Sequence, residues 1–135
     1  MAEWMSQAAA IPMRDGQICL VSSSGGRRWV IPKGAIELGH TAGQTALIEA
    51  WEEAGLVGSI QPEPVGSYLY EKDNRINHVV VFLMQVHEES VTWPEQGKRS
   101  RIWVSIPEAI EKLQDASLRD LLTAVFLQPT FSTLA

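Results

Sequence analysis

The sequence predicts an α+β fold in which a mixed β-sheet lies between helices. The first observation is the order of the expected elements, which runs strands, helix, strands, helices. The second is the nearly continuous apolar stretch 79–86, which is typical of a central strand buried on both faces. The third is the composition, since 135 residues with 45% hydrophobic and 20% charged side chains fit one globular domain with its own core.

Strands in the first part of the chain are predicted from alternation and turn signals. Residues 8–13 form a candidate edge strand, because Pro12 near its end lacks a backbone N–H. A turn signal over 14–16 leads into 17–21, which we expect to be the hairpin partner. A short strand is expected over 28–31, after a flexible loop.

One helix is predicted together with both of its ends. Thr41 and Gln44 form a capping box, in which each side chain meets a free backbone N–H of the first turn. The helix then runs over 42–54 to Gly55, which suits the left-handed conformation that ends many helices. The stretch 33–41 before it is expected to be a loop. The face expected to pack on the core consists of Ala46, Leu47, Ala50, Trp51 and Ala54.

The second half of the chain is expected to complete the sheet and then to add helices. Strands are recognised by apolar and aromatic runs, and the first of the helices by a proline in its first turn. The expected elements are a strand at 68–70, a polar loop at 71–77, strands at 79–86 and 101–105, a helix from Pro107 to Leu113, and a last helix at 118–127.

The composition excludes several classes of protein. The single cysteine, Cys19, allows neither an intramolecular disulfide nor a Cys-rich zinc site. The longest apolar run, 79–84, is too short to cross a bilayer, and the first residues lack the pattern of a signal peptide. A net charge of −5 argues against binding of nucleic-acid polymers by bulk charge. We therefore expect a cytoplasmic protein that contacts neither membranes nor nucleic-acid polymers.

Three carboxylates, those of Glu49, Glu52 and Glu53, share one face of the predicted helix because of their spacing. Like charges one turn apart cost about 0.2–0.5 kcal/mol per pair, and the negative end of the helix dipole disfavours them further. A divalent cation would compensate this cost, since Mg²⁺ takes oxygen ligands and commonly uses one or two carboxylates together with substrate phosphates. The alternative is a solvated acidic face without a ligand.

The stretch around these carboxylates reads PKGAIELGHTAGQTALIEAWEEAGLVG from Pro32. It resembles the Nudix box, G-x5-E-x7-R-E-U-x-E-E-x-G-U, where U is a bulky aliphatic residue. Gly34 fills the first glycine, Glu49 the glutamate after the arginine, and Glu52 and Glu53 the glutamate pair. The segments WVIP before the box and RIWV after it extend the resemblance over nearly the whole chain. Within the family these segments look most like the hydrolases of diphosphoinositol polyphosphates and diadenosine polyphosphates.

The resemblance implies a Nudix-type α/β/α sandwich with a mixed central sheet and the box helix packed on it. It places a single domain over 8–127, with terminal extensions at 1–7 and 128–135. It also implies hydrolysis of a diphosphate bond in a small phosphorylated substrate. Such a substrate is a dinucleoside polyphosphate, another nucleoside diphosphate derivative or a diphosphoinositol polyphosphate. The sequence leaves monomer and homodimer both open.

The resemblance also assigns the metal site. Glu49, Glu52 and Glu53 would hold Mg²⁺ or Mn²⁺, and a backbone carbonyl of Lys33 or Gly34 could add another oxygen ligand. The ions would activate a water molecule for attack on a phosphorus of the diphosphate, with catalysis mainly from positioning and charge neutralisation. The general base is left open between Glu49 and Glu53 of the box and three later glutamates. These later candidates are Glu88, Glu89 and Glu95.

Three positions depart from the box. Ala50 is a mild departure, since it only replaces a larger aliphatic residue, but His40 stands where the box has its first glutamate and Ile48 where it has arginine. In the family that arginine helps to orient the neighbouring glutamate, so Glu49 lacks its usual partner. These departures support an alternative function, a catalytically weak Nudix fold that binds a nucleotide or polyphosphate. His40 itself is either an imidazole near the metals or a polar loop residue.

Candidate substrate-binding residues are cations, because arginine in particular pairs bidentately with phosphate. No spacing rule selects among them, and each is equally consistent with ordinary surface charge. Trp29 is open between stacking on a base and packing in the core. The candidate phosphate contacts are Arg27, Arg28, Lys33, Lys98, Arg99 and Arg101.

Overall fold

The structure of the chain, a computed structural model, describes residues 3–127. The terminal extension predicted at 128–135 therefore lies outside the described residues. The elements in the described range are β1 (Glu3–Arg14), β2 (Gln17–Ser22), β3 (Trp29–Val30), β4 (Lys33–Ala35), α1 (Ala42–Ala54), β5 (Leu56–Ile60), β6 (Gly66–Lys72), β7 (Arg75–Glu89), β8 (Arg101–Ser105), α2 (Ile106–Lys112) and α3 (Ala116–Phe126).

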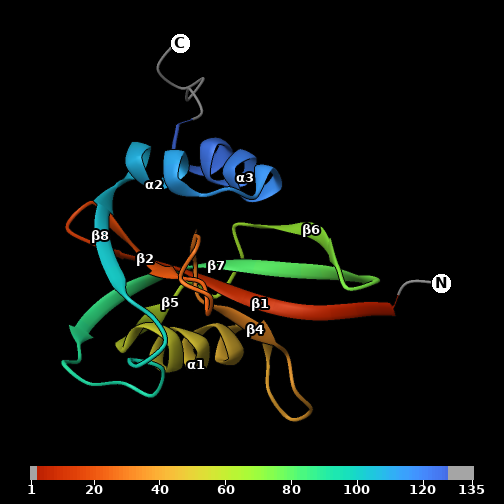
Figure 1. Cartoon of the computed structure of the whole chain (residues 1–135), viewed down its shortest axis with the longest axis horizontal. Helices are drawn as coiled ribbons and strands as arrows, with labels where there is room; N and C mark the ends of the chain where they lie inside the picture. Colours follow the sequence, from red (N-terminus) through yellow and green to blue (C-terminus); the bar gives the residue numbers. More distant parts are fainter. Residues whose placement is uncertain (1–2, 128–135) are drawn as a thin grey trace.

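The sheet is built around two long strands, β1 and β7, which run parallel to each other over 3–13 and 75–85. The order of its main path is β3-β2-β1-β7-β5, and β4, β6 and β8 pair with β1, β7 and β2. Helix α1 covers one face of the sheet, and α2 with α3 covers the other (Figure 1). The predicted α/β/α sandwich with a mixed sheet is confirmed.

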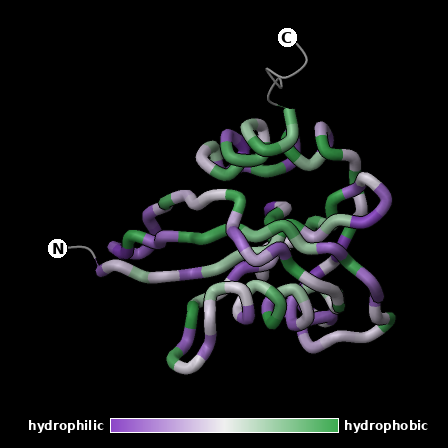
Figure 2. The backbone as a smooth tube through the Cα atoms, turned by 180° about the vertical axis from the view of Figure 1, so that it is seen from behind, coloured by the Kyte–Doolittle hydropathy of each residue, from purple (hydrophilic) through white to green (hydrophobic). Residues whose placement is uncertain are grey.

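Side chains along β1 point alternately to the two faces of the sheet, and they contribute to an apolar core on each face. Ala8 and Ala10 belong to the core beneath α1, whereas Ala9 and Ile11 belong to the core on the opposite face. The hydrophobic backbone segments run through the middle of the sheet, between the helical layers (Figure 2). Alanines on the α1 side let the helix approach the sheet closely.

The predicted helix has the predicted bounds and both predicted caps. The Gln44 N–H donates to Thr41 Oγ1 at 3.0 Å, and the Thr41 N–H donates to Gln44 Oε1 at 2.9 Å. Gly55 adopts the left-handed conformation with φ 68° and ends the helix. Local sequence alone therefore determines where α1 begins and ends.

The face of α1 that packs on the sheet differs from the prediction. Ala46, Ala50 and Ala54 are fully buried as expected, but Trp51 is 38% exposed, so its predicted place in the core is wrong. Glu53 is buried instead, with 5% exposed. The close approach of the alanines leaves no room for an indole, and the helix is turned so that its acidic edge lies against the rest of the protein.

Three other expectations about the sheet are corrected. β1 is central rather than an edge strand, because it pairs with β7 along one side and with β4 and β2 along the other. Pro12 is tolerated because it falls between the pairing with β4 and the pairing with β2. The loop expected over 71–77 is largely strand, and only Asp73 and Asn74 form the turn, both with positive φ. The short strands β4 and β5 were not predicted, since neither has a clear alternating pattern.

Replacing Gly58 by alanine should destabilise the protein by about 3 kcal/mol, the upper end of the range for overpacking. A Cβ atom at this bulged position of β5 would lie 1.9 Å from the backbone oxygen of Gln85, which cannot move aside. Urea unfolding measures the loss. Gly97→Ala is the matched control, because no atom lies within 4 Å of its Cβ position. Equal stability of the two variants would contradict the prediction.

Candidate functional site

One carboxylate of α1, that of Glu49, meets β4 at Gly34. Glu53 is buried, and Glu49 and Glu52 are half-buried. A Cβ atom on Gly34 would lie 2.5 Å from both Cδ and Oε1 of Glu49. The Glu49 carboxylate therefore lies directly against the backbone of Gly34, and it leaves no room there for a side chain unless it moves.

Two of the carboxyl groups are electrostatically strained. Burial raises the pKa of Glu53 to about 8, Arg99 opposes this rise, and a hydrogen bond with Glu49 and the charges of Glu49 and Glu95 add to it. Burial also raises the pKa of Glu49, where the hydrogen bond with Glu53 opposes the rise and the charge of Glu52 adds to it. Burial and the mutual repulsion of these carboxylates therefore outweigh the opposing charge of Arg99 at Glu53.

Arg99, on the segment between β7 and β8, faces the same carboxylates. Its Nη2 lies 3.8 Å from Glu53 Oε2, and its Nε lies 2.7 Å from Glu95 Oε1. Its Nη1 donates to the backbone oxygen of Ser22 at 2.9 Å. The side chains of Arg99 and Glu53 are 14% and 6% exposed. Arg99 is thus held beside the acidic pair.

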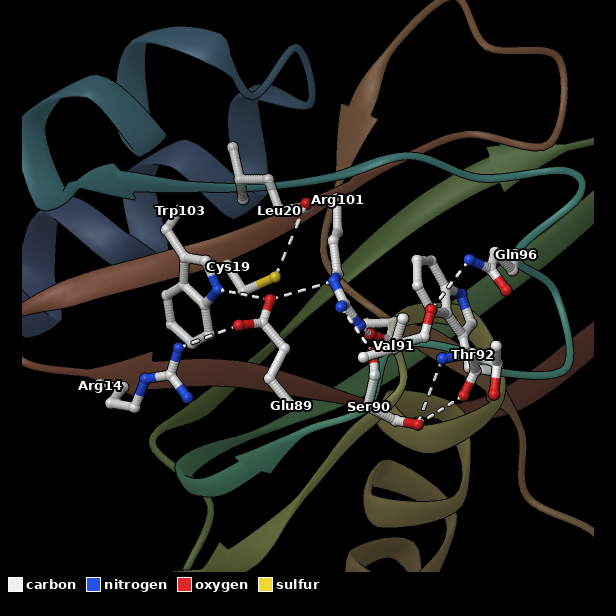
Figure 3. A network of polar contacts seen from close by, with 12 residues as sticks. Arg14, Cys19, Leu20, Glu89, Ser90, Val91, Thr92, Gln96, Arg101 and Trp103 are labelled. Atoms are coloured by element: carbon white, nitrogen blue, oxygen red, sulfur yellow. Dashed lines mark hydrogen bonds and ion pairs between the residues drawn. The ribbon is translucent and has the colours of Figure 1, made fainter.

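Arg101 lies at the end of α1, where its Nη1 donates to the backbone oxygen of Ala54 at 2.7 Å. Its Nε pairs with Glu89 at 3.0 Å, and Glu89 also pairs with Arg14 and accepts from Trp103 Nε1 (Figure 3). Burial opposes ionisation of Glu89, but these hydrogen bonds and the two arginine charges outweigh it and lower its pKa. Glu89 is therefore engaged by three donors rather than free to take up a proton.

A cavity of about 330 Å³ lies between the sheet and the α2–α3 layer, and Lys33 is one of its lining residues. Lys33 Nζ donates to the hydroxyl of Tyr70 at 3.0 Å, and this hydroxyl donates to Gln7 Oε1 at 2.9 Å. The rings of Tyr68 and Tyr70 stack with centroids 6.2 Å apart. Lys33 and Gly34 are neighbours on β4, so the Lys33 side chain points into the cavity on one face of the sheet, whereas Gly34 contacts Glu49 on the other face.

The six cations predicted to contact phosphate lie in three places. Two line the cavity, two are exposed on loops, and two contact the end of α1 or its carboxylates. Arg28 and Lys33 line the cavity. Arg27 and Lys98 are the exposed pair. Arg99 contacts a carboxylate of α1, and Arg101 contacts the end of the helix.

Sequence reasoning missed the aromatic lining of the cavity. Tyr68 and Tyr70 were placed on a strand, and their spacing of two puts both side chains on one face of β6. That spacing is the signal that could have identified them as a pair. Trp29, which the sequence leaves open between stacking on a base and packing in the core, is half-buried, packs against the core and also lines this cavity.

His40 and Ile48, which replace the two charged residues of the box, have no evident chemical role in the structure. His40 is exposed in the turn before α1, where its N–H donates to the Glu37 oxygen at 3.1 Å. Ile48 is half-buried on the helix. The structure gives neither residue a contact that would replace the charges of the box.

The acidic pair has the donor chemistry of a Mg²⁺ or Mn²⁺ site, although it is not a closed cage. Among residues 3–127, no three His, Cys, Asp or Glu side chains are grouped to hold a metal ion. Mg²⁺ commonly needs only one or two protein carboxylates, because water and substrate phosphates complete its shell. Glu49, Glu53 and the neighbouring carbonyl of Gly34 fit this pattern, with Glu52 further along the same helix face.

Without metal, Glu53→Gln should become increasingly stabilising as the pH rises. The pKa of Glu53 is about 8 in the folded state, above its ordinary value. Its favourable contribution is therefore complete at low pH and is lost as the pH rises through the folded value. Urea unfolding in a chelator at pH 5 and pH 9 compares wild type, Glu53→Gln and the exposed control Glu111→Gln. A wild-type-to-Glu53→Gln difference that is the same at both pH values would contradict the assignment.

Comparison with known proteins identifies relatives along nearly the whole chain. A family model described as the NUDIX domain matches residues 5–125. "Nudix hydrolase 4" of Arabidopsis thaliana is 36% identical over 110 residues, covering 80% of this chain and 53% of that protein. The bovine "Diphosphoinositol polyphosphate phosphohydrolase 3-beta" is 31% identical over 104 residues, covering 75% of this chain and 62% of that protein.

Solved structures show the same fold at lower identity. A binary complex of the Ap4A hydrolase of C. elegans superposes with a TM-score of 0.76 at 22% identity, covering 91% of this chain and 97% of that one. The chain spans about half to two thirds of the length of the curated relatives it matches. No helix within residues 3–127 is long and apolar enough to span a membrane.

Proposed function

This chain belongs to the Nudix family, and on that premise we propose that it hydrolyses the diphosphate bond of a small phosphorylated substrate with the help of Mg²⁺ or Mn²⁺. The observation that carries the proposal is the strained acidic pair on α1. Glu49 lies against Gly34 and Glu53 is hydrogen-bonded to Glu49, and both occupy positions that the family's motif assigns to metal ligands. Glu52 joins them as the third box carboxylate. Such a cluster is costly without a cation and is explained by one.

In the proposed reaction, a water oxygen forms a bond to one phosphorus while the bond from that phosphorus to the bridging oxygen breaks. Two phosphate-bearing products leave, and the proton of the water passes to a carboxylate. Glu53 and Glu49 are the candidate bases, and Glu95 lies close enough to influence both. The metal ions, when bound, neutralise the charge of the diphosphate and activate the attacking water.

Arg99 would act on the phosphates beside the acidic pair, whereas Lys33 would contact the part of the substrate held in the cavity. Lys33 Nζ donates to the Tyr70 hydroxyl inside the cavity, and Arg99 is held beside Glu53. Arg28 lies further along the same cavity. Such cations orient a diphosphate for in-line attack and stabilise the charge that develops on its oxygens.

The cavity favours a nucleoside diphosphate derivative, including a dinucleoside polyphosphate, over a diphosphoinositol polyphosphate. Its lining combines three aromatic rings, those of Trp29, Tyr68 and Tyr70, with a small net charge. Aromatic rings offer stacking to a base, whereas an inositol ring densely covered with phosphates needs many cations. Its charged groups are the three cations Arg28, Lys33 and Lys72 and the two carboxylates of Glu71 and Asp115.

Product release from a panel of diphosphates tests the proposal. The panel holds diadenosine polyphosphates, ADP-ribose, nucleoside triphosphates and diphosphoinositol polyphosphates, each with Mg²⁺, with Mn²⁺ and with a chelator. We expect metal-dependent turnover, highest on a nucleotide member. Turnover that persists in the chelator would overturn the metal-dependent mechanism.

The alternative remains a Nudix fold that binds a nucleotide or polyphosphate without turning it over. The observation that favours it is the absence of the box charges at His40 and Ile48. Calorimetric binding of panel members without product would establish this alternative. We also propose that the protein is cytoplasmic. Size-exclusion chromatography would decide between monomer and homodimer.

A further inference from the structure

We propose that Arg101 is a positioning residue that holds the end of α1, and with it the carboxylates of Glu49 and Glu53, in the active arrangement. The role is distinct from the phosphate contact that the sequence suggested for Arg101. The inference rests on the proposed function, because it concerns the same carboxylates. Its structural part concerns the end of the helix alone and can be tested without turnover.

Arg101 uses its guanidinium in three directions at once. Nη1 donates to the Ala54 oxygen at 2.7 Å, Nη2 donates to the Ser90 oxygen at 2.6 Å, and Nε pairs with Glu89 at 3.0 Å. The side chain is 16% exposed. The guanidinium forms a rigid planar fork, so it fixes the two backbone segments relative to β7; a lysine ammonium has no such fork.

Trp93 acts together with Arg101, and we call these two side chains the clamp on the end of α1. The Arg101 guanidinium lies 4.1 Å from the centre of the Trp93 ring, and Trp93 Nε1 donates to the backbone oxygen of Glu53 at 2.9 Å. A Cβ atom on Gly55 would lie 2.8 Å from Arg101 Nη1 and 2.9 Å from Trp93 Cβ. The helix therefore ends in a fitted contact with both side chains.

The clamp accounts for the last backbone oxygens of α1. Those of Glu52, Glu53 and Ala54 accept, in order, from the Glu95 N–H, from Trp93 and from Arg101. Without such partners, the last carbonyls of a helix have none within the helix. The last turn of α1 contains no basic residue, so Arg101 also supplies the positive charge that a helix end favours.

The position of the clamp explains why it would matter for chemistry. Glu53 is held by its backbone oxygen within the clamp, and Glu49 lies one helical turn before it. A small rotation or fraying of this turn would move both carboxylates relative to Gly34. Misplacement of a reacting group by about 1 Å can lower a rate by about 100-fold.

Arg14 provides a matched control within the same network (Figure 3). It pairs with the other oxygen of Glu89 at 3.0 Å and lies 4.7 Å from the centre of a tryptophan ring, that of Trp103. Neither of these partners belongs to α1. Arg14→Lys therefore disturbs the ion pair and the ring contact while leaving the clamp on the helix intact.

The experiment compares Arg101→Lys, Trp93→Phe and Arg14→Lys by hydrogen exchange of the metal-free proteins, by Mn²⁺ binding without substrate and by steady-state kinetics. For Arg101→Lys we expect faster exchange at the end of α1, about tenfold weaker Mn²⁺ binding, and a fall in kcat of about 30–100-fold with KM nearly unchanged. Trp93→Phe keeps an aromatic ring but removes the N–H that donates to the backbone oxygen of Glu53, so it should show the same changes more weakly. Arg14→Lys should show none of them.

Several results would overturn the inference. Equal effects of Arg101→Lys and Arg14→Lys would mean that Arg101 is an ordinary structural ion pair. A raised KM with unchanged kcat would return Arg101 to phosphate binding. If wild type turns over no substrate, the proposed function fails, and exchange at the end of α1 still decides the clamp. If Arg101→Lys does not fold, Trp93→Phe with unchanged exchange and Mn²⁺ binding would overturn it.

Discussion

Replacing Glu52 and Glu53 together by glutamine should lower metal-dependent turnover by at least about 10³-fold, because polarisation by metal ions is worth several kcal/mol of transition-state stabilisation. Glutamine matches glutamate in size but carries no charge, so the variant keeps its packing and loses two of the three box carboxylates. Glu53 is buried and is hydrogen-bonded to Glu49. The measurement is product release on the best member of the diphosphate panel with saturating Mg²⁺ or Mn²⁺.

Stability separates a chemical effect from unfolding in this variant. The pKa of Glu53 is raised in the metal-free protein, so removal of its charge should leave the fold at least as stable as wild type near neutral pH. The exposed control Glu111→Gln should keep both stability and turnover. Full turnover in a stable Glu52→Gln/Glu53→Gln protein would remove these carboxylates from the mechanism.

The parts of the fold that the sequence predicts are those governed by local rules. The bounds of α1 follow from Thr41, Gln44 and Gly55, which form hydrogen bonds within the helix or adopt a special backbone conformation there. The central strand β7 follows from its apolar run. β4 and β5 are different, because their residues pair with distant strands and have little periodicity of their own. The position of β1 depends on how the whole sheet is assembled, which Pro12 alone does not determine.

The candidate site divides in the same way. Helical spacing places Glu49 and Glu53 on one face, but it does not tell which edge of the helix is buried. Alanine packing on the sheet decides that point, and it buries Glu53 while it exposes Trp51. The cations are less predictable still, because their roles depend on side-chain direction. Arg101 and Arg99 are near neighbours in sequence, yet Arg101 donates to the backbone oxygen of Ala54 at the end of α1, whereas Arg99 faces the carboxylate of Glu53.

Replacing Gly34 by alanine should lower kcat by about 100-fold while the protein stays folded. A Cβ atom here would lie 2.5 Å from Glu49 Cδ and Oε1, at the far end of a flexible side chain. The Glu49 carboxylate can rotate away, whereas the backbone need not move, and Gly34 is not among the glycines with positive φ. The single methyl group that the variant adds would therefore push the Glu49 carboxylate away from its place beside Glu53. Kinetics and urea unfolding on the same preparation measure both effects.

Gly25→Ala is the matched control for this change, because no atom lies within 4 Å of its Cβ position. It should keep the wild-type rate and stability, so that any loss in Gly34→Ala reflects the contact with Glu49. The added variant Gly34→Ala/Glu49→Gln should be no slower than Glu49→Gln alone, because both changes act through one side chain. Additive losses in the double variant, or a wild-type rate in Gly34→Ala, would show that the contact between Gly34 and Glu49 does not set the geometry of the reaction.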